Sequence, residues 1–168
     1  MNTMKNRILI IFGIILSNLT FAQDSLQNLE IVRCFTEALI KQSDSAITKC
    51  MPNQKDILYF TEIAKEFNPD RAIPNSDMII NKMTQGARKN YNRVIEKGKL
   101  DSIIWDSIII KNVRLEKMLP EFNKVDRANI FITYSSGNQI FVIKLTKCLR
   151  IDEKWIMMDR FIYIRHKE

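Results

Sequence analysis

The chain is poor in histidine: among its 168 residues there is one, His166, close to the C-terminal end. Metal sites commonly use histidine, and serine or cysteine nucleophiles usually need a histidine partner. The sequence also lacks the motifs GxSxG, HExxH, Walker A and GxGxxG. Catalysis would therefore rest on carboxylates or tyrosines alone, and we expect neither a metal nor a cofactor.

Cysteine is scarce as well. The three cysteines are Cys34, Cys50 and Cys148, and the absence of CxxC excludes a thioredoxin-like redox motif and zinc-ribbon spacing. An odd count leaves at least one thiol unpaired or paired between chains. Cys34 precedes a polar break at "SDS" (43–45) and Cys50 follows it. If the two helices fold back on each other at this break, the two cysteines would lie side by side. We predict a Cys34–Cys50 disulfide; the alternative is that all three are small core residues.

Long apolar runs are missing too. A membrane span needs roughly 20 apolar residues, whereas "ILIIFGIIL" (8–16) has nine. Lys5 and Arg7 precede this run, and Thr20 and Ala22 have the spacing that signal peptidase accepts, which is the plan of a secretory signal. We predict a signal peptide over residues 1–22, cleaved after Ala22, and a periplasmic or secreted protein. An uncleaved anchor is the alternative.

The charge excess is mild. Cleavage after Ala22 would leave 24 of the 26 basic residues against 19 acidic ones, so the net charge would fall from +7 to +5. A nucleic-acid-binding domain would show a clustered, strongly basic face, and we expect no nucleic-acid partner. One predicted helix places basic residues along its outer face, namely Lys82, Lys89, Arg93 and Lys97, with Arg88 nearby. They predict either a solvated face or a contact with an acidic envelope component.

Apolar residues recur at steps of three and four through the first hundred positions. They predict a helix over "LQNLEIVRCFTEALIKQ" (26–42), a short helix ending near Pro52, and a third over "NQKDILYFTEIAKEF" (53–67). Two prolines make "NPDRAIPNS" (68–76) a loop. A longer helix should run from about Asp77 to Lys97, with Ser76 as its cap and Gly98 ending it in a left-handed turn.

After Gly98 the pattern changes to β-branched and alternating residues. "SIIIKNVRL" (107–115) predicts a strand and "PEFNKVD" (120–126) a loop; "RANIFITYSS" and "QIFVIKLTKCLR" flank Gly137–Asn138, a strong hairpin signal. "KWIMMDRFIYIR" (154–165) predicts one last strand, turned back by "IDEK". Because residues 140–143 are apolar on both faces, both faces need cover: helices could cover one, and a ligand or a second subunit part of the other.

Helices first and an antiparallel meander after them predict an α+β fold, with residues 23–168 as a single domain. Two stretches, "EIVRCFTEALIKQSDSAITKCM" and "IFVIKLTKCLRIDEKWIMMDRFIYI", resemble the cystatin-like and NTF2-like superfamily as found in small exported bacterial proteins. The resemblance implies a curved sheet that wraps a long helix. It leaves the function open, because members include isomerases, dehydratases, ligand binders and non-catalytic scaffolds.

The candidate site residues are carboxylates and aromatics. Asp106 follows Trp105, and an aromatic wall could raise the pKa of its carboxyl group; the alternative is a capping or edge residue. Asp159 interrupts an apolar strand, where we expect either a structural pair with Lys144 or an exposed edge position; the alternative is a pocket carboxylate. Tyr59, Tyr91 and Tyr134, together with Trp105, would suit the wall of a ligand cavity, or pack in the core.

The sequence thus predicts an exported, non-catalytic binding domain for a small apolar ligand or an envelope protein partner, with a homodimer through the sheet as one arrangement. Two alternatives stay open: an isomerase- or hydratase-like enzyme that uses a pocket carboxylate, and a structural or inhibitory envelope protein. A deep cavity with a carboxylate would favour the enzyme, and a filled interior with an exposed apolar sheet face would favour the interaction protein.

Overall fold

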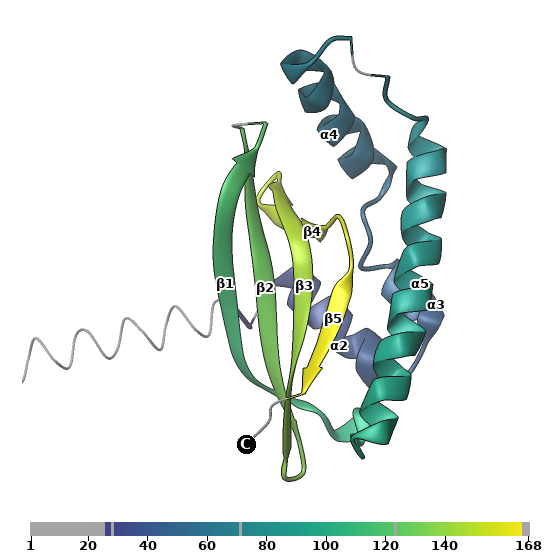
Figure 1. The fold of residues 1–168 in the computed structure, drawn as a ribbon, viewed down its shortest axis with the longest axis vertical. Coiled ribbons are helices and arrows are strands. Elements are labelled where there is room, and N and C mark those ends of the chain that lie inside the picture. Colours follow the sequence, from purple (N-terminus) through teal and green to yellow (C-terminus); the bar gives the residue numbers. More distant parts are fainter. Residues whose placement is uncertain (1–25, 28, 71, 123, 166–168) are drawn as a thin grey trace, which may run out of the picture.

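The computed structural model describes residues 26–165 except 28, 71 and 123; the predicted signal peptide, its cleavage site and His166 lie outside them. The helices are α2 (Glu30–Lys41), α3 (Asp44–Thr48), α4 (Gln54–Phe67) and α5 (Ser76–Leu100), followed by the 3-10 turn η1 (Trp105–Ser107). The strands are β1 (Ile109–Glu121), β2 (Val125–Ser136), β3 (Gln139–Ile151), β4 (Lys154–Met157) and β5 (Phe161–Arg165). The predicted α+β class is confirmed (Figure 1).

The strands form one antiparallel sheet in the order β1-β2-β3-β4, and β5 pairs with β3 further along the edge that β4 occupies. Gly137, with φ of 56°, lies in the turn between β2 and β3. The turn between β3 and β4 is made by Asp152 and Glu153, with φ of 47° and 65°, because positive φ at both central residues suits the twist of a two-residue hairpin. Both turns lie where the sequence predicts them.

The prediction of one final strand is wrong, because residues 158–160 separate β4 from β5. Opposite this break, β3 carries a bulge, where its register with β2 shifts and Lys147 adopts a φ of 51°. Thr146 bridges the gap: its backbone N–H donates to the Arg160 carbonyl at 2.9 Å and its hydroxyl donates to the same oxygen at 2.7 Å. A bulge adds a residue that the neighbouring strand cannot match, so the neighbour leaves the ladder there.

The predicted ends of α5 are also wrong. Asn75, rather than Ser76, caps its start, because the Asn75 side chain accepts a hydrogen bond from the Asp77 N–H at 2.7 Å. Gly98 does not end the helix in a left-handed turn; it lies inside α5, and the left-handed residue after the helix is Ser102, with φ of 59°. A Cβ built on Gly98 would lie 2.0 Å from Cζ2 of Trp105, so glycine is required there for a close approach.

The first strand is longer than predicted. β1 runs over Ile109–Glu121 instead of residues 107–115, and it pairs with β2 as far as Glu121 opposite Val125. The loop predicted over residues 120–126 is therefore reduced to a tight turn. Phe122 in this turn has a φ of 51° and, despite its loop position, a half-buried side chain.

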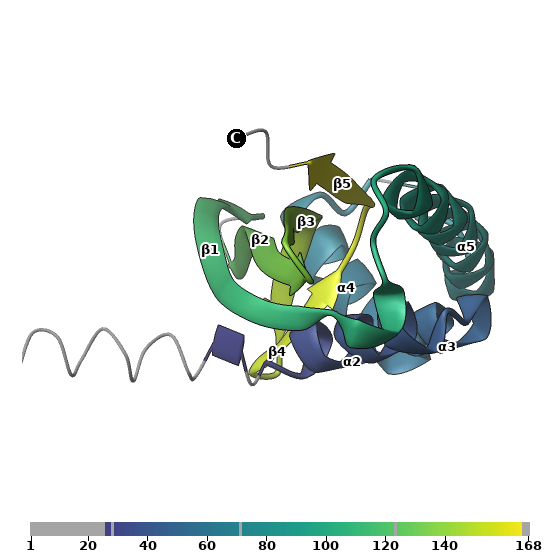
Figure 2. The same ribbon diagram turned by 90° about the horizontal axis from the view of Figure 1, so that it is seen from below.

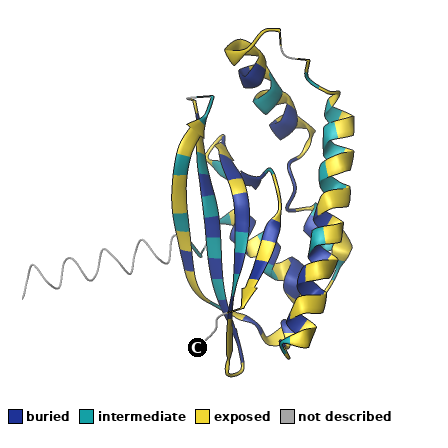
Figure 3. Cartoon of the chain, viewed as in Figure 1, coloured by how far each residue is buried: buried dark blue, intermediate teal, exposed yellow. Residues whose placement is uncertain are grey.

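The helices cover the two faces of the sheet unequally (Figures 2 and 3). Cys148 and Met157 belong to the larger core cluster, which includes residues of α2 and α5, whereas their neighbours Leu149 and Ile156 belong to a smaller cluster with Ile63 of α4. Adjacent residues of a strand point to opposite faces. It follows that α2 and α5 cover one face and that α4 covers one end of the opposite face, here named the outer face.

The rest of the outer face stays open within the described residues. Ile140, Ile162 and Ile164 are 49%, 38% and 39% exposed. The register places Val142 beside Ile164 and Lys144 beside Ile162, so these aliphatic side chains form one patch across β3 and β5. The sequence predicts that helices cover one face, and α2 and α5 do so, while α4 also covers one end of the other face. Cover of the remaining outer face by a ligand or a second subunit stays a prediction.

The structure joins Cys34 of α2 to Cys50, just after α3, by a disulfide whose Cα atoms are 5.6 Å apart. The two helices fold back on each other because Gln42 ends α2 with a left-handed φ of 46°. Cys148 is a free thiol, fully buried in the larger core cluster.

Candidate functional site

Three of the predicted site residues lie in the main core. Tyr91, Trp105 and Tyr134 are 2%, 2% and 0% exposed. Trp105 and Tyr134 both pack on Phe141, with ring centroids 5.5 Å and 5.4 Å from it. The Tyr91 side chain also lines a polar cleft of about 460 Å³ together with Asp44.

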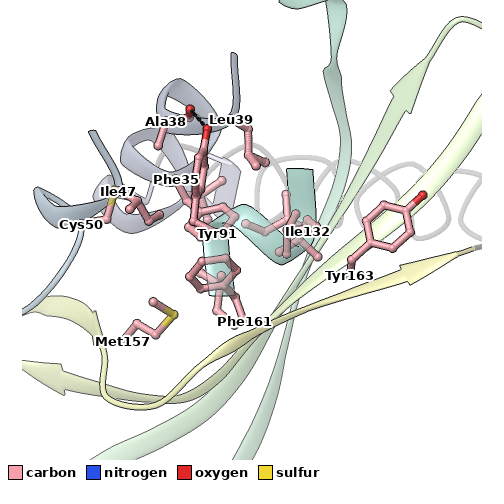
Figure 4. Close-up of a cluster of buried hydrophobic side chains, with 14 of the residues drawn as sticks. Phe35, Ala38, Leu39, Ile47, Cys50, Tyr91, Ile132, Met157, Phe161 and Tyr163 are labelled. Atoms are coloured by element: carbon pink, nitrogen blue, oxygen red, sulfur yellow. Dashed lines mark hydrogen bonds between the residues drawn. The ribbon is translucent and has the colours of Figure 1, made fainter. Parts of the chain in front are cut away.

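The buried tyrosines have hydrogen-bond partners. The Tyr91 hydroxyl donates to the Ala38 carbonyl at 2.8 Å, as Figure 4 shows, and the Tyr134 hydroxyl lies 2.8 Å from the hydroxyl of Thr36. Burial, with the nearby Asp44 charge, raises the pKa of Tyr91 to about 12. Burial also raises the pKa of Tyr134, and that of the Cys148 thiol to about 12. These groups therefore stay protonated near neutral pH and are poor general bases there.

The other predicted residues lie outside this core, although Asp106 directly follows Trp105. Tyr59 is 41% exposed on α4, and Asp106 is exposed on η1. Asp159 lies in the break between β4 and β5, with a side chain 34% exposed. The structure thus does not bring Tyr59, Asp106 and Asp159 together with the buried aromatics.

The prediction that Asp159 pairs with Lys144 is wrong. Asp159 Oδ2 lies 3.7 Å from Lys147 Nζ and 4.0 Å from Arg160 Nε. Lys144 extends over the Phe131 ring instead, with its Nζ 4.9 Å from the ring centroid. The bulge at Lys147 explains the exchange, because the extra residue of β3 brings Lys147 beside the break.

A cleft of about 410 Å³ lies beside α4. Its walls are α4, the segment that leads into α5, the first turn of α5, the turn between β1 and β2, and the residue that follows β4. This α4 cleft is lined by Ile57, Phe60, Thr61, Ala64, Ala72, Ile73, Pro74, Ile79, Glu121, Phe122 and Met158. Nine of these eleven residues carry apolar side chains, and the volume is within the range of small-molecule sites.

The local sequence explains how α4 is held in place. Asn53 accepts a hydrogen bond from the Asp56 N–H, and the Asp56 side chain accepts one from the Asn53 N–H, which is a capping box. Ile63 then packs into the smaller core cluster with Val125, Leu149, Ile151 and Ile156. One side of the helix is therefore anchored on the sheet.

Aromatic rings close one side of the cleft. Phe122 lies 5.5 Å from Phe60 and 5.4 Å from Phe67, measured between ring centroids. Phe67 itself remains 59% exposed. A ring from the β1–β2 turn thus faces rings from α4, and the cleft lies between elements that are about sixty residues apart in sequence.

The cleft has one ionisable residue among its described lining residues, Glu121. Its carboxylate accepts a hydrogen bond from Arg127 Nη1 and forms an ion pair with it. Since the carboxylate is engaged, the cleft offers a neutral, apolar surface. In the part of the chain that the structure describes, no group of three or more histidine, cysteine, aspartate or glutamate residues is placed to hold a metal.

This cleft is not apparent from the sequence. Ile57, Phe60 and Ala64 follow the periodicity of a core-facing helix, and that pattern does not distinguish packing on protein from lining a cleft. The available signal was the presence of Phe122 and Ile73 in segments predicted as loops, since large apolar residues in a loop must be covered by something.

The chain matches no family model, no curated protein and no solved structure. The class of protein rests on the fold alone: within the described residues, helices α2–α5 precede a five-stranded antiparallel sheet, which is an α+β fold. Among the described residues, no helix combines the length and the apolar character that a membrane crossing requires.

Proposed function

We propose that the chain is an exported, non-catalytic binding domain that holds a small, uncharged, apolar ligand in the α4 cleft. The observation that carries the proposal is the cleft itself, about 410 Å³ in volume and lined almost entirely by apolar side chains. Transfer of apolar ligand surface out of water is favourable by about 25 cal/mol per Å². The lining carboxylate, Glu121, is paired with Arg127, so the described lining offers no unpaired charge to an ionic ligand.

Two features support the rest of the proposal. A disulfide persists in oxidising compartments and is rare in the cytosol, so the Cys34–Cys50 bond agrees with export by the predicted signal peptide. Binding without catalysis agrees with the lining of the cleft, where the described residues offer one hydroxyl, Thr61, and one carboxylate that is already paired.

The test uses the neutral dye N-phenyl-1-naphthylamine, whose fluorescence rises in apolar surroundings. The full chain is expressed with its leader, and the exported product is purified. If cleavage follows Ala22, the intact mass of this product should equal that of a chain that begins at Gln23. We expect saturable dye binding. Thr61→Trp should fill the cleft from its rim and weaken binding about tenfold or more, while urea unfolding shows that the variant remains folded.

Glu62→Trp is the matched control, because Glu62 is exposed on the same helix and does not line the cleft. It should bind the dye as the wild type does. Absence of saturable binding, or equal binding by Thr61→Trp and the wild type, would refute the proposal.

The open patch on the outer face favours a second candidate function, association of two copies of the chain through the sheet. Exposed Ile140, Ile162 and Ile164 form this patch on β3 and β5, and apolar patches of this kind mark contact surfaces. Sedimentation should then show a dimer that Ile164→Lys dissociates and that Leu119→Lys, at a position 83% exposed on β1, leaves intact. A monomer at all concentrations would rule this candidate out.

A further inference from the structure

A second groove, of about 270 Å³, runs between α5 and β5. Figure 1 shows that the two elements run side by side. This α5–β5 groove is lined by Asn90, Arg93, Val94 and Lys97 of α5 and by Arg160, Phe161, Ile162 and Tyr163. Because it shares no lining residue with the α4 cleft, a role for this groove is independent of ligand binding in that cleft.

The charge of this groove has one sign. Arg93 and Lys97 are one helical turn apart and therefore project on the same side of α5, and Arg160 faces them from the opposite wall. No aspartate or glutamate is among the lining residues. Three cationic residues thus line one small volume.

These cations are poorly neutralised by the protein. Neither Arg93 nor Lys97 has an ion pair among the described residues, whereas Lys99 on the same helix pairs with Glu96 at 3.0 Å. Arg160 lies 4.0 Å from Asp159, and Asp159 also lies 3.7 Å from Lys147. A cleft lined by charges of one sign concentrates the opposite charge, so the groove is arranged to attract an anion.

The floor of the groove is apolar and fixed. Val94, Phe161 and Tyr163 are 3%, 3% and 8% exposed. Phe161 packs edge-on against Phe35 of α2 with centroids 4.7 Å apart, as the close-up in Figure 4 shows. The Tyr163 hydroxyl is already used, because it donates to Asp101 Oδ2 at 2.8 Å. The floor therefore provides apolar contact rather than free hydrogen-bonding groups.

From this juxtaposition of three cations and an apolar floor, we propose that the α5–β5 groove binds a small amphiphilic anion, a carboxylate, sulfonate or phosphate attached to an apolar body. The anionic group lies between Arg93, Lys97 and Arg160, where charge-assisted hydrogen bonds are strongest. The apolar body lies on the floor formed by Val94, Phe161 and Tyr163. An anion without an apolar body, such as inorganic phosphate, uses half of this site and binds more weakly.

The probe is 1-anilinonaphthalene-8-sulfonate, which is N-phenyl-1-naphthylamine with one added sulfonate. We expect the mature protein to bind it saturably, with an affinity that falls as salt rises from about 0.05 M to about 0.5 M, because the Debye length shortens. Arg93→Gln/Lys97→Gln should weaken binding about tenfold or more, since two charged donors are lost. Both positions are exposed, so the fold should be kept, which urea unfolding checks.

Lys82→Gln/Arg88→Gln is the matched control. It removes the same charge from the same helix, at exposed positions outside the groove, and it should change the affinity for the sulfonate less than twofold. Neutral N-phenyl-1-naphthylamine should bind the Arg93→Gln/Lys97→Gln variant as it binds the wild type.

Three results would overturn the proposal: the groove variant binds the sulfonate like the wild type, the control weakens it as much as the groove variant does, or Thr61→Trp alone abolishes binding. The last result would place the sulfonate in the α4 cleft. If the wild type binds the sulfonate but not the neutral dye, this result would count against the proposed function and would still support the proposal for the groove.

Discussion

The indole of Trp105 occupies the space that a side chain at Gly98 would need. A Cβ at this position would lie 2.0 Å from Cζ2 and 2.7 Å from Cε2 of the ring. Trp105 is 2% exposed and also packs edge-on against Phe141, so the ring has little room to move. The absence of a side chain at Gly98 therefore allows η1 to pack closely against the end of α5.

Gly98→Ala should consequently destabilise the protein. Alanine favours a helix interior over glycine by about 1 kcal/mol, but overfilling a packed site costs about 1–3 kcal/mol, and a contact this short belongs at the upper end. We expect a net loss of about 1–2 kcal/mol in the free energy of unfolding, measured by urea denaturation.

Gly86 provides the matched control for this substitution. It lies in the same helix, and a Cβ there would meet nothing within 4 Å. Gly86→Ala should therefore stabilise the protein by up to about 1 kcal/mol. If both alanine variants are stabilised, the close approach of Trp105 to Gly98 does not exist in solution.

Gly98 also shows where sequence reasoning stops. A glycine near the end of a helical pattern predicts a left-handed cap, and nothing local distinguishes that role from close contact with a ring seven residues later. The order of helices and strands was predictable, because periodicity and turn residues are local signals. The division of the last strand was not, because it depends on a bulge at Lys147 in a different strand.

The candidate sites, too, depend on long-range contacts that local sequence patterns do not reveal. Tyr91 and Tyr134 were placed on the correct elements by their spacing, yet spacing cannot say whether a ring faces a cavity or another ring. The α4 cleft exists because Phe122 meets Phe60 and Phe67 across the molecule, and the α5–β5 groove because Arg160 faces Arg93. Contacts of this range are set by tertiary packing and are absent from any local pattern.

The three cysteines should differ sharply in reactivity. Without reductant, peptide mapping should recover Cys34 linked to Cys50, and Cys148 should react with iodoacetamide only after unfolding, because it is buried and burial raises the pKa of its thiol to about 12. The bond links residues 16 apart, and closing a loop of this size stabilises a protein by about 3 kcal/mol. Reduction should lower the free energy of unfolding by about that amount. Free Cys34 in the non-reduced map would contradict the structure.

Stability should fall at alkaline pH. Burial raises the pKa of Tyr91 and of Cys148, each to about 12, whereas in the unfolded chain tyrosine titrates near about 10 and cysteine near about 8.5. The folded state thus holds these protons more tightly, so their contribution is complete below the unfolded pKa and is lost as the pH rises towards the folded pKa. The free energy of unfolding should decline from about pH 8.5 upward, by at most about 1.4 kcal/mol per pH unit for each group.

Two tyrosine variants test this assignment. Tyr91→Phe removes one of the titrating groups, so between about pH 10 and pH 12 its stability should decline less steeply than that of the wild type. Tyr59→Phe, at a position 41% exposed, should keep the wild-type slope. The comparison uses slopes, because loss of the hydrogen bond to Ala38 lowers the stability of Tyr91→Phe at every pH. Equal slopes for all three proteins would show that Tyr91 titrates normally.

Thr146 should matter more than its single hydroxyl suggests. This hydroxyl donates to the Arg160 carbonyl at 2.7 Å and lies 3.2 Å from the Arg160 N–H, which donates to it. Thr146→Val keeps the shape but removes both bonds, and we expect a loss of about 1–2 kcal/mol in the free energy of unfolding. Thr133→Val is the control, since Thr133 is half-exposed on the outer face, and it should change stability by less than about 0.5 kcal/mol.

A second measurement separates this role from general stability. Thr146 fixes the backbone of Arg160, which carries one of the three cations of the α5–β5 groove. Relative to the wild type, Thr146→Val should speed hydrogen exchange of the β5 amides more than that of the β1 amides. The affinity for 1-anilinonaphthalene-8-sulfonate should also fall, although no charge has been removed. Binding of the neutral dye should change less than binding of the sulfonate, because Met158 is the one lining residue of the α4 cleft that belongs to this break. If the variant exchanges uniformly and keeps the sulfonate affinity, the break between β4 and β5 is not what positions Arg160.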